Sequence, residues 1–138
     1  MIKAIYPIIL TQTKDVVLVE VPDFEILTEG KDLLEAIEMA RDAIGLTGIT
    51  MQDRGQQIPE PSLLSDIDVQ KGTFASEGEN IVSLVDIDFM VYRRRMDNKT
   101  VRRNVTLPNW LNQEAENAHI NVSKVLQEAL MQKLNVSR

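Results

Sequence analysis

The sequence predicts an α+β fold in two parts, a sheet-and-helix domain at residues 1–92 and a strand-helix-helix module at residues 100–138. Three observations predict it. Runs of Ile and Val precede a helical pattern in the first part, residues 93–99 are almost wholly polar, and acidic and basic side chains are unevenly divided. We therefore expect residues 93–99 to be a linker.

The uneven charge predicts two kinds of partner. The 138-residue chain has a formal net charge of −6. Residues 1–90 hold six basic and seventeen acidic side chains, whereas residues 91–138 hold nine basic and four acidic ones. This division favours a polyanionic partner for the second half, with chance clustering as the alternative.

Composition narrows the class of protein. The chain has no cysteine, which excludes disulfides and thiolate metal sites and fits a reducing cytosol. The N-terminus carries no signal-peptide pattern, and no segment approaches the roughly 20 apolar residues of a membrane span. We expect a soluble, cytoplasmic protein without a membrane partner.

The first domain begins with a predicted hairpin. Residues 3–10 and 15–21 are rich in Ile and Val, and the polar residues 11–14 lie between them as a turn. Pro22-Asp23 ends the second strand, and residues 25–28 add a short third one.

A helix is expected next. Asp32 is its N-cap, and Glu35 three residues later completes a capping box. Apolar residues then recur at helical spacing up to Ile44, and Gly45 is the expected end of the helix. Residues 47–80 are rich in turn residues, and a last strand with alternating side chains is expected at residues 80–89.

The C-terminal module begins with an isolated strand. Residues 100–107 alternate in polarity, and Pro108 stops them. Because a single strand leaves its backbone groups unpaired, we expect it to pair with the same strand of a second copy. Two short helices follow, near 109–118 and from the N-cap Asn121 onward. They cannot bury enough surface alone, so an obligate homodimer through residues 100–138 is expected.

This order of elements resembles the ribbon-helix-helix family of repressors, in which a two-stranded antiparallel ribbon enters the DNA major groove. The resemblance implies that outward ribbon side chains read bases and that the second helix binds a phosphate through its N-terminus. The inward Arg103 departs from the usual apolar residue and is expected to reach a phosphate. A dimerisation module that does not bind DNA is the alternative. The predicted DNA-binding residues are Arg102, Arg103, Asn104, Thr106, Ser123 and Lys124.

Ordered motifs in the first domain resemble the HicB family of antitoxins. They are Tyr6-Pro7-Ile8-Ile9-Leu10, Val19-Glu20-Val21-Pro22-Asp23, Thr28-Glu29-Gly30, Leu33-Leu34-Glu35-Ala36 and Ile58-Pro59-Glu60-Pro61-Ser62. The resemblance covers essentially the whole chain. The sequence departs from the family pattern in two places. Residues 16–18 replace the Gly-Gly-Tyr often found in the family, and residues 24–26 replace the Pro-Gly-Cys.

The resemblance implies a partial RNase H-like domain that neutralises HicA, a small basic mRNA-cleaving toxin, in a type II toxin-antitoxin system. The acidic charge of this domain independently suits a basic partner. The resemblance to HicB proteins also implies that the protein represses its own operon by binding operator DNA. The expected toxin-binding residues are Asp23, Glu25, Glu35, Glu38 and Asp42.

Enzymatic and ligand-sensing functions are the alternatives. A two-metal nuclease would need several converging carboxylates, for which Glu20, Asp23, Asp86 and Asp88 are the candidates. Acids at strand ends are more often solvated, and the single histidine, His119, lies in the turn between the C-terminal helices. We therefore expect no catalytic residue, no metal and no cofactor. A repressor that senses a small molecule without a toxin is the remaining alternative.

Overall fold

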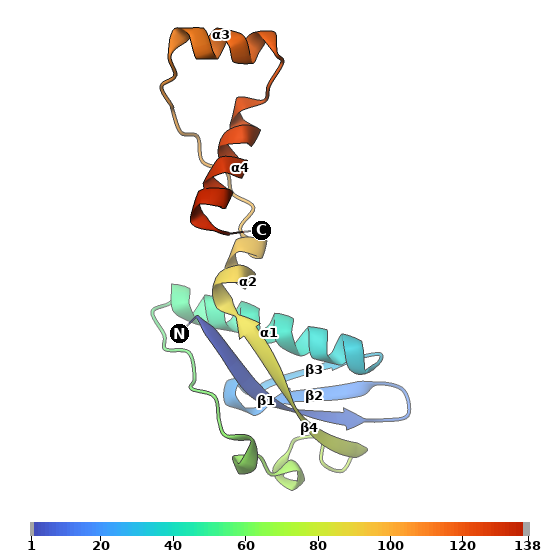
Figure 1. Cartoon of the computed structure of the whole chain (residues 1–138). Helices are drawn as coiled ribbons and strands as arrows, with labels where there is room; N and C mark the ends of the chain where they lie inside the picture. Colours follow the sequence, from blue (N-terminus) through green and yellow to red (C-terminus); the bar gives the residue numbers. More distant parts are fainter. Residues whose placement is uncertain (1, 137–138) are drawn as a thin grey trace. The chain divides into compact units, whose positions relative to one another are not determined.

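The computed structural model describes residues 2–136 and divides the chain into two compact units, Met1–Met96 and Asp97–Arg138. Each unit is described by itself below. The first contains a sheet and two helices, and the second contains two helices (Figure 1). The α+β class expected from the sequence is confirmed.

The first unit contains a four-stranded antiparallel sheet with the order β3-β2-β1-β4. Its strands are β1 (Lys3–Gln12), β2 (Val17–Val21), β3 (Ile26–Gly30) and β4 (Glu79–Asp88). The expected hairpin, third strand and last strand are all confirmed. Pro7 is tolerated within β1 because β2 pairs only with Ile9–Gln12, so β1 needs no donor toward β2 at that position.

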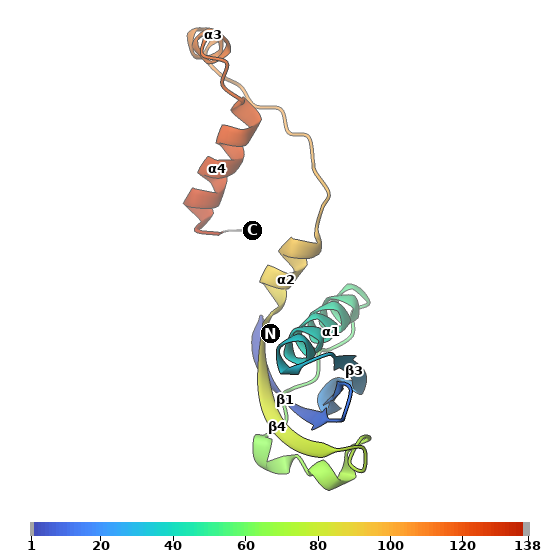
Figure 2. The same ribbon diagram turned by 90° about the vertical axis from the view of Figure 1, so that its right-hand side faces the viewer.

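Alternating side chains place the core on one face of the sheet. Tyr6, Ile8 and Leu10 of β1 are buried there together with Val85 and Ile87 of β4. Helix α1 (Leu33–Asp53) covers this face and contributes Ala36, Ala40 and Ile44 to the core (Figure 2). The apolar positions expected from helical spacing are thus the ones that pack on the sheet.

The N-cap of α1 forms as expected, with one change of partner. The side chain of Asp32 accepts a hydrogen bond from the main-chain N–H of Glu35 at 2.8 Å. The carboxylate of Glu35 accepts from the N–H of Lys31 at 3.3 Å rather than from the N-cap residue itself. Both carboxylates still satisfy free main-chain donors at the start of the helix.

The expected end of α1 at Gly45 is wrong, since the helix continues to Asp53. Gly45 and Gly48 are buried within it, where a second helix crosses. A Cβ on Gly48 would lie 2.3 Å from Phe89, and a Cβ on Gly45 would lie 2.7 Å from Tyr92. These glycines allow close packing between helices rather than a left-handed turn.

That second helix, α2 (Phe89–Met96), corrects the start of the expected linker. Residues 93–96 are helical and belong to the first unit. Arg93 joins α2 to α1, because its guanidinium donates to Asp53 at 2.9 Å, to the side chain of Gln52 at 2.9 Å and to the carbonyl of Ile49 at 3.4 Å. The polarity of residues 93–95 therefore reflects a helix–helix contact and an exposed helix face.

The long connection from α1 to β4 is fastened to the sheet at several points. It contains two 3-10 turns, η2 (Leu64–Asp66) and η3 (Val69–Lys71). The hydroxyl of Tyr6 donates to the carbonyl of Pro59 at 2.6 Å, and the carboxylate of Glu20 accepts from the N–H and hydroxyl of Thr73 at 2.8 and 2.9 Å. The connection is held in place although it contains no strand or α-helix.

The second unit contains α3 (Asn109–Asn117) and α4 (Val122–Leu134). Asn121 is the N-cap of α4, as expected, and its side chain accepts from the N–H of Lys124 at 3.1 Å. Residues 97–108 have no regular secondary structure in the single chain. The strand expected at residues 100–107 is therefore absent from the isolated chain.

Candidate partner-binding surfaces

Helix α1 gathers three of the expected acidic residues on one face. Glu35, Glu38 and Asp42 are spaced by three and four residues, which places them on one side of a helix. Glu38 and Asp42 are exposed. Met39 and Leu46 are also exposed, at 40% and 54%, and lie on the same side. This surface, called the α1 acidic face below, combines negative charge with accessible apolar area.

The three acids differ in whether their carboxylates already pair with a basic group. Glu35 bonds the Lys31 N–H and lies 3.8 Å from its ammonium group, so its charge is partly neutralised. In the described chain, Glu38 and Asp42 make no ion pair. Glu38 and Asp42 are consequently the acids of this face that are available to a basic partner.

Helix α2 borders the α1 acidic face. Burial raises the pKa of the Tyr92 phenol, and the negative charge of Asp42 raises it further. The phenol of Tyr92 therefore lies within the electrostatic reach of Asp42. A partner bound over Asp42 would lie next to the element that leads into the second unit.

The other expected partner-binding acids lie at the turn between β2 and β3. Asp23 belongs to the 3-10 turn η1 (Pro22–Phe24), and its carboxylate accepts from the N–H of Ser62 at 2.9 Å and from the Ser62 hydroxyl. Glu25 follows with a φ of 55° and is exposed. Asp23 is thus engaged within the fold, whereas Glu25 is free to contact a partner.

The carboxylates considered for a metal site are also engaged elsewhere. Glu20 accepts from Thr73, Asp86 pairs with Arg41 at 3.1 Å, and Asp88 accepts from the first N–H groups of α2. Across residues 2–136, no three or more His, Cys, Asp or Glu side chains come together as a metal site. These carboxylates hold elements of the fold together.

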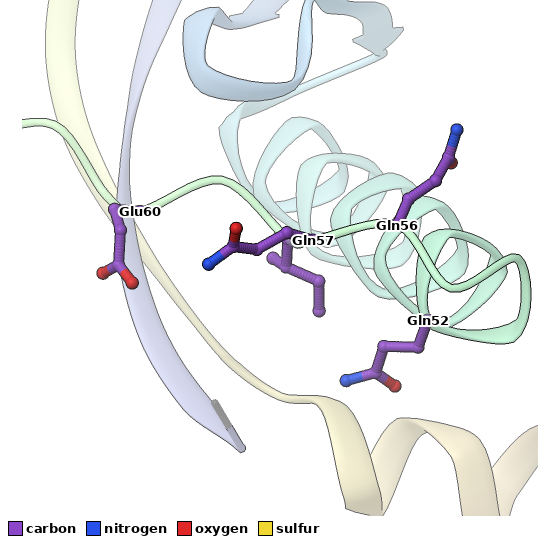
Figure 3. A pocket seen from close by; sticks show the side chains of 5 residues that line it. Gln52, Gln56, Gln57 and Glu60 are labelled. Carbon is purple, nitrogen blue, oxygen red and sulfur yellow. The ribbon is translucent and has the colours of Figure 1, made fainter.

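A hollow of about 250 Å³ lies at the C-terminal end of α1. Its lining includes Gln52, Gln56, Gln57 and Glu60, whose side chains point in different directions (Figure 3). The side chain of Gln52 already accepts a hydrogen bond from Arg93. Since the polar groups do not converge, this hollow gives the ligand-sensing alternative no support.

The second unit brings part of the expected DNA-binding set together. A groove of about 590 Å³ is lined by Arg102, Arg103 and Ser123 together with apolar residues that include Leu126 and Leu130 of α4. Asn104 and Thr106 are exposed outside this groove, and Lys124 is exposed in the first turn of α4. The basic residues and the N-terminus of α4 therefore form one surface within this unit.

The second unit also exposes its apolar residues. Val101 is 91% exposed, Trp110 62% and Leu130 51%, and no residue from 97 to 136 is buried. Such a unit has no core of its own. Exposed apolar area on this scale is typical of surfaces that bind another protein. None of the helices in residues 2–136 has the length and hydropathy needed to cross a lipid bilayer.

Comparison with known proteins defines the class as a bacterial antitoxin. Residues 6–132 match the family model described as a HicB-like antitoxin of bacterial toxin-antitoxin systems. Because this match spans nearly all of the chain, the protein belongs to the HicB-like antitoxin family. No curated protein matches the chain significantly.

Solved structures share this fold. A toxin-antitoxin complex from Streptococcus pneumoniae contains a chain with 20% identity and a TM-score of 0.59, and the match covers 95% of this chain and 99% of that one. The antitoxin HicB of Burkholderia pseudomallei has 25% identity and a TM-score of 0.51, with 98% of each chain covered. A chain of a HicA3 and HicB3 toxin-antitoxin complex has 22% identity and a TM-score of 0.50, with 62% and 99% covered.

Proposed function

We propose that this protein neutralises a HicA-type toxin through its first unit and represses its own operon through its second. The observation that supports neutralisation is the α1 acidic face, where free Glu38 and Asp42 adjoin exposed Met39 and Leu46. A basic RNA-cleaving toxin suits this charge, and apolar area contributes affinity. One structural relative comes from a toxin-antitoxin complex and another from a complex of HicA3 and HicB3, which supports a toxin as the partner.

In this proposal the first unit is a partial RNase H-like domain that acts by binding and is not an enzyme. It covers the toxin surface that binds or cleaves RNA. The engagement of Glu20, Asp23, Asp86 and Asp88 within the fold supports a binding role. Protection of a reporter mRNA from the toxin is the functional readout.

The second proposed activity is operator binding by a ribbon-helix-helix homodimer. Residues 100–107 of two copies would pair as an antiparallel ribbon and cover the apolar side chains that one copy leaves exposed. Arg102, Asn104 and Thr106 would then face base edges, while Arg103, Ser123 and Lys124 hold phosphates. The observation that supports this is a unit without buried residues that carries a basic groove.

One experiment tests both activities. The full chain is co-expressed with the neighbouring open reading frame of its operon, purified through a tag on the antitoxin, and titrated onto the promoter fragment. A stoichiometric small basic protein and a salt-sensitive shift are expected. A shift without the partner would leave a repressor that does not bind a toxin, and the partner without a shift would leave a dimerisation module.

A base-reading role for the ribbon requires a separate measurement. Arg102→Ala and Asn104→Ala should relax sequence preference in footprinting, since each removes a bidentate contact worth about 1–3 kcal/mol of discrimination. Unchanged preference in both variants would contradict the ribbon assignment.

A further inference from the structure

We infer that Arg94 and Arg95 of α2 form a second DNA-backbone contact, which binds phosphates beside the operator bases read by the second unit. This inference rests on the proposed DNA binding. It concerns residues of the first unit, which is otherwise acidic.

The three consecutive arginines of α2 have different surroundings. Arg93 is engaged with Asp53 and Gln52 of α1. Phe89 and Tyr92 pack over Gly48 and Gly45 of α1. Of the two arginines that follow Arg93, Arg95 is exposed and Arg94 is half-buried. Within residues 2–136, neither Arg94 nor Arg95 makes an ion pair or a hydrogen bond through its side chain.

Two neighbouring arginines whose side chains have no partner in the described residues are suited to bind phosphate groups. Arginine forms bidentate hydrogen bonds with phosphate oxygens, and its charge is weakly hydrated compared with that of lysine. The contacts that fasten α2 to α1 also hold these two side chains on a structured helix, so less conformational entropy is lost on binding. The pair is therefore better prepared to bind a polyanion than arginines in a flexible tail would be.

Chain length sets an upper limit on the separation between this pair and the proposed ribbon. Arg95 precedes Arg102 by seven residues, which span at most about 25 Å when fully extended. Duplex DNA carries a negative charge about every 1.7 Å along its axis. When Arg102 lies in the major groove, Arg95 is at most about 25 Å from it, and this radius includes phosphates of the flanking base pairs.

The test measures the salt dependence of DNA binding by the full-length protein. Arg94→Gln/Arg95→Gln is compared with wild type and with Lys14→Gln/Lys71→Gln, which removes the same charge from two exposed positions of the first unit. Affinities for the promoter fragment and for a non-specific duplex of equal length are measured between about 50 and 200 mM salt. Arg94→Lys/Arg95→Lys retains the charge.

The arginine-to-glutamine variant is expected to reduce the slope of log K against log salt by about 3 to 4 per dimer, at roughly 0.9 per phosphate contact. Its base preference should be unchanged. The lysine variant should keep most of the slope, and the Lys14/Lys71 control should keep all of it. An equal loss in that control would overturn the inference, because the effect would then come from total charge.

The outcomes separate this inference from the proposed function. Operator binding with an unchanged slope in the arginine variant overturns the inference and leaves the repressor function standing. Non-specific binding that depends on Arg94 and Arg95, without operator preference, supports the inference and overturns the repressor function. Absence of binding to either duplex overturns both.

Discussion

The carboxylate of Asp23 accepts two hydrogen bonds from Ser62, one from the main-chain N–H at 2.9 Å and one from the side-chain hydroxyl. These residues are 39 positions apart, at the turn after β2 and in the connection after α1. The Pro-Asp turn and the Ile-Pro-Glu-Pro-Ser segment are therefore two halves of one contact. Asp23, one of the acids expected to bind the toxin, thus also fixes the path of the chain within the first unit.

Removing this contact should destabilise the first unit. Asp23→Asn and Ser62→Ala are each expected to lower the free energy of unfolding by about 1–3 kcal/mol, because each disrupts a charge-assisted, partly buried hydrogen bond. The double variant should lose less free energy of unfolding than the two single variants lose together. Urea unfolding should give a coupling energy of roughly 1 kcal/mol between the two positions. Asp15→Asn and Ser65→Ala provide an exposed pair that should be additive. Additivity in the Asp23 cycle would contradict the contact.

Tyr6 should make the protein sensitive to alkaline pH. Burial, with help from the charges of Asp23 and Glu60, raises the pKa of Tyr6 from 10.0 to about 12. Because the folded state holds this proton more tightly than the unfolded state, the stabilisation is complete below pH 10. It is lost as pH rises from 10 to about 12. Thermal unfolding over this range should therefore show a steep decline in stability.

Tyr6→Phe should flatten that decline. The variant also loses the hydrogen bond to the Pro59 carbonyl, so its free energy of unfolding at neutral pH should fall by about 1 kcal/mol. Tyr92→Phe is the control and should retain the larger part of the alkaline decline, since Tyr92 is the chain's other tyrosine. Equal slopes in wild type and Tyr6→Phe would rule out this explanation.

Gly48→Ala should disturb the docking of α2 on α1. The added methyl would lie 2.3 Å from the ring of Phe89, and overpacking of this kind costs about 1–3 kcal/mol. The loss should appear as a lower urea midpoint. Phe89→Leu in the same chain should recover part of it, whereas Thr47→Ala on α1 should have little effect. A neutral Gly48→Ala would show that the two helices do not pack closely.

Charge reversal on the α1 acidic face should slow association with a basic toxin. Glu38→Lys/Asp42→Lys is expected to lower the association rate by about 10-fold or more at low salt, and the difference should shrink as salt screens the charges. Asp15→Lys/Glu77→Lys changes the net charge equally at exposed positions elsewhere. Stopped-flow or surface-based kinetics would measure both rates. Equal slowing would assign the effect to overall charge.

Much of the fold is predictable because its causes are local. The hairpin, the third strand and β4 follow from short runs of β-branched residues bounded by turns. The caps at Asp32 and Asn121 bond main-chain N–H groups only three residues away. The family match over residues 6–132 confirms the resemblance that rests on motif order.

The two incorrect sequence predictions, the helix end at Gly45 and the linker start at residue 93, have a common physical cause. Gly45 has the usual character of a helix end, but Tyr92 packs on it from α2, 47 residues later, and the helix continues. Residues 93–96 are polar, as linkers are, but Arg93 is held by α1. In both places a contact between distant segments overrides the local pattern.

The sequence by itself determined the strands of the sheet, the helix caps and the separation of acidic from basic charge. Each depends on neighbours a few residues apart or on composition alone. Only the tertiary structure decided which charged side chains remain free. Glu20, Asp23 and Arg93 find partners 39 to 53 positions away, whereas Glu38, Asp42, Arg94 and Arg95 find none in residues 2–136. Pairing between distant charged groups depends on how the chain folds back on itself, and local sequence does not specify that path.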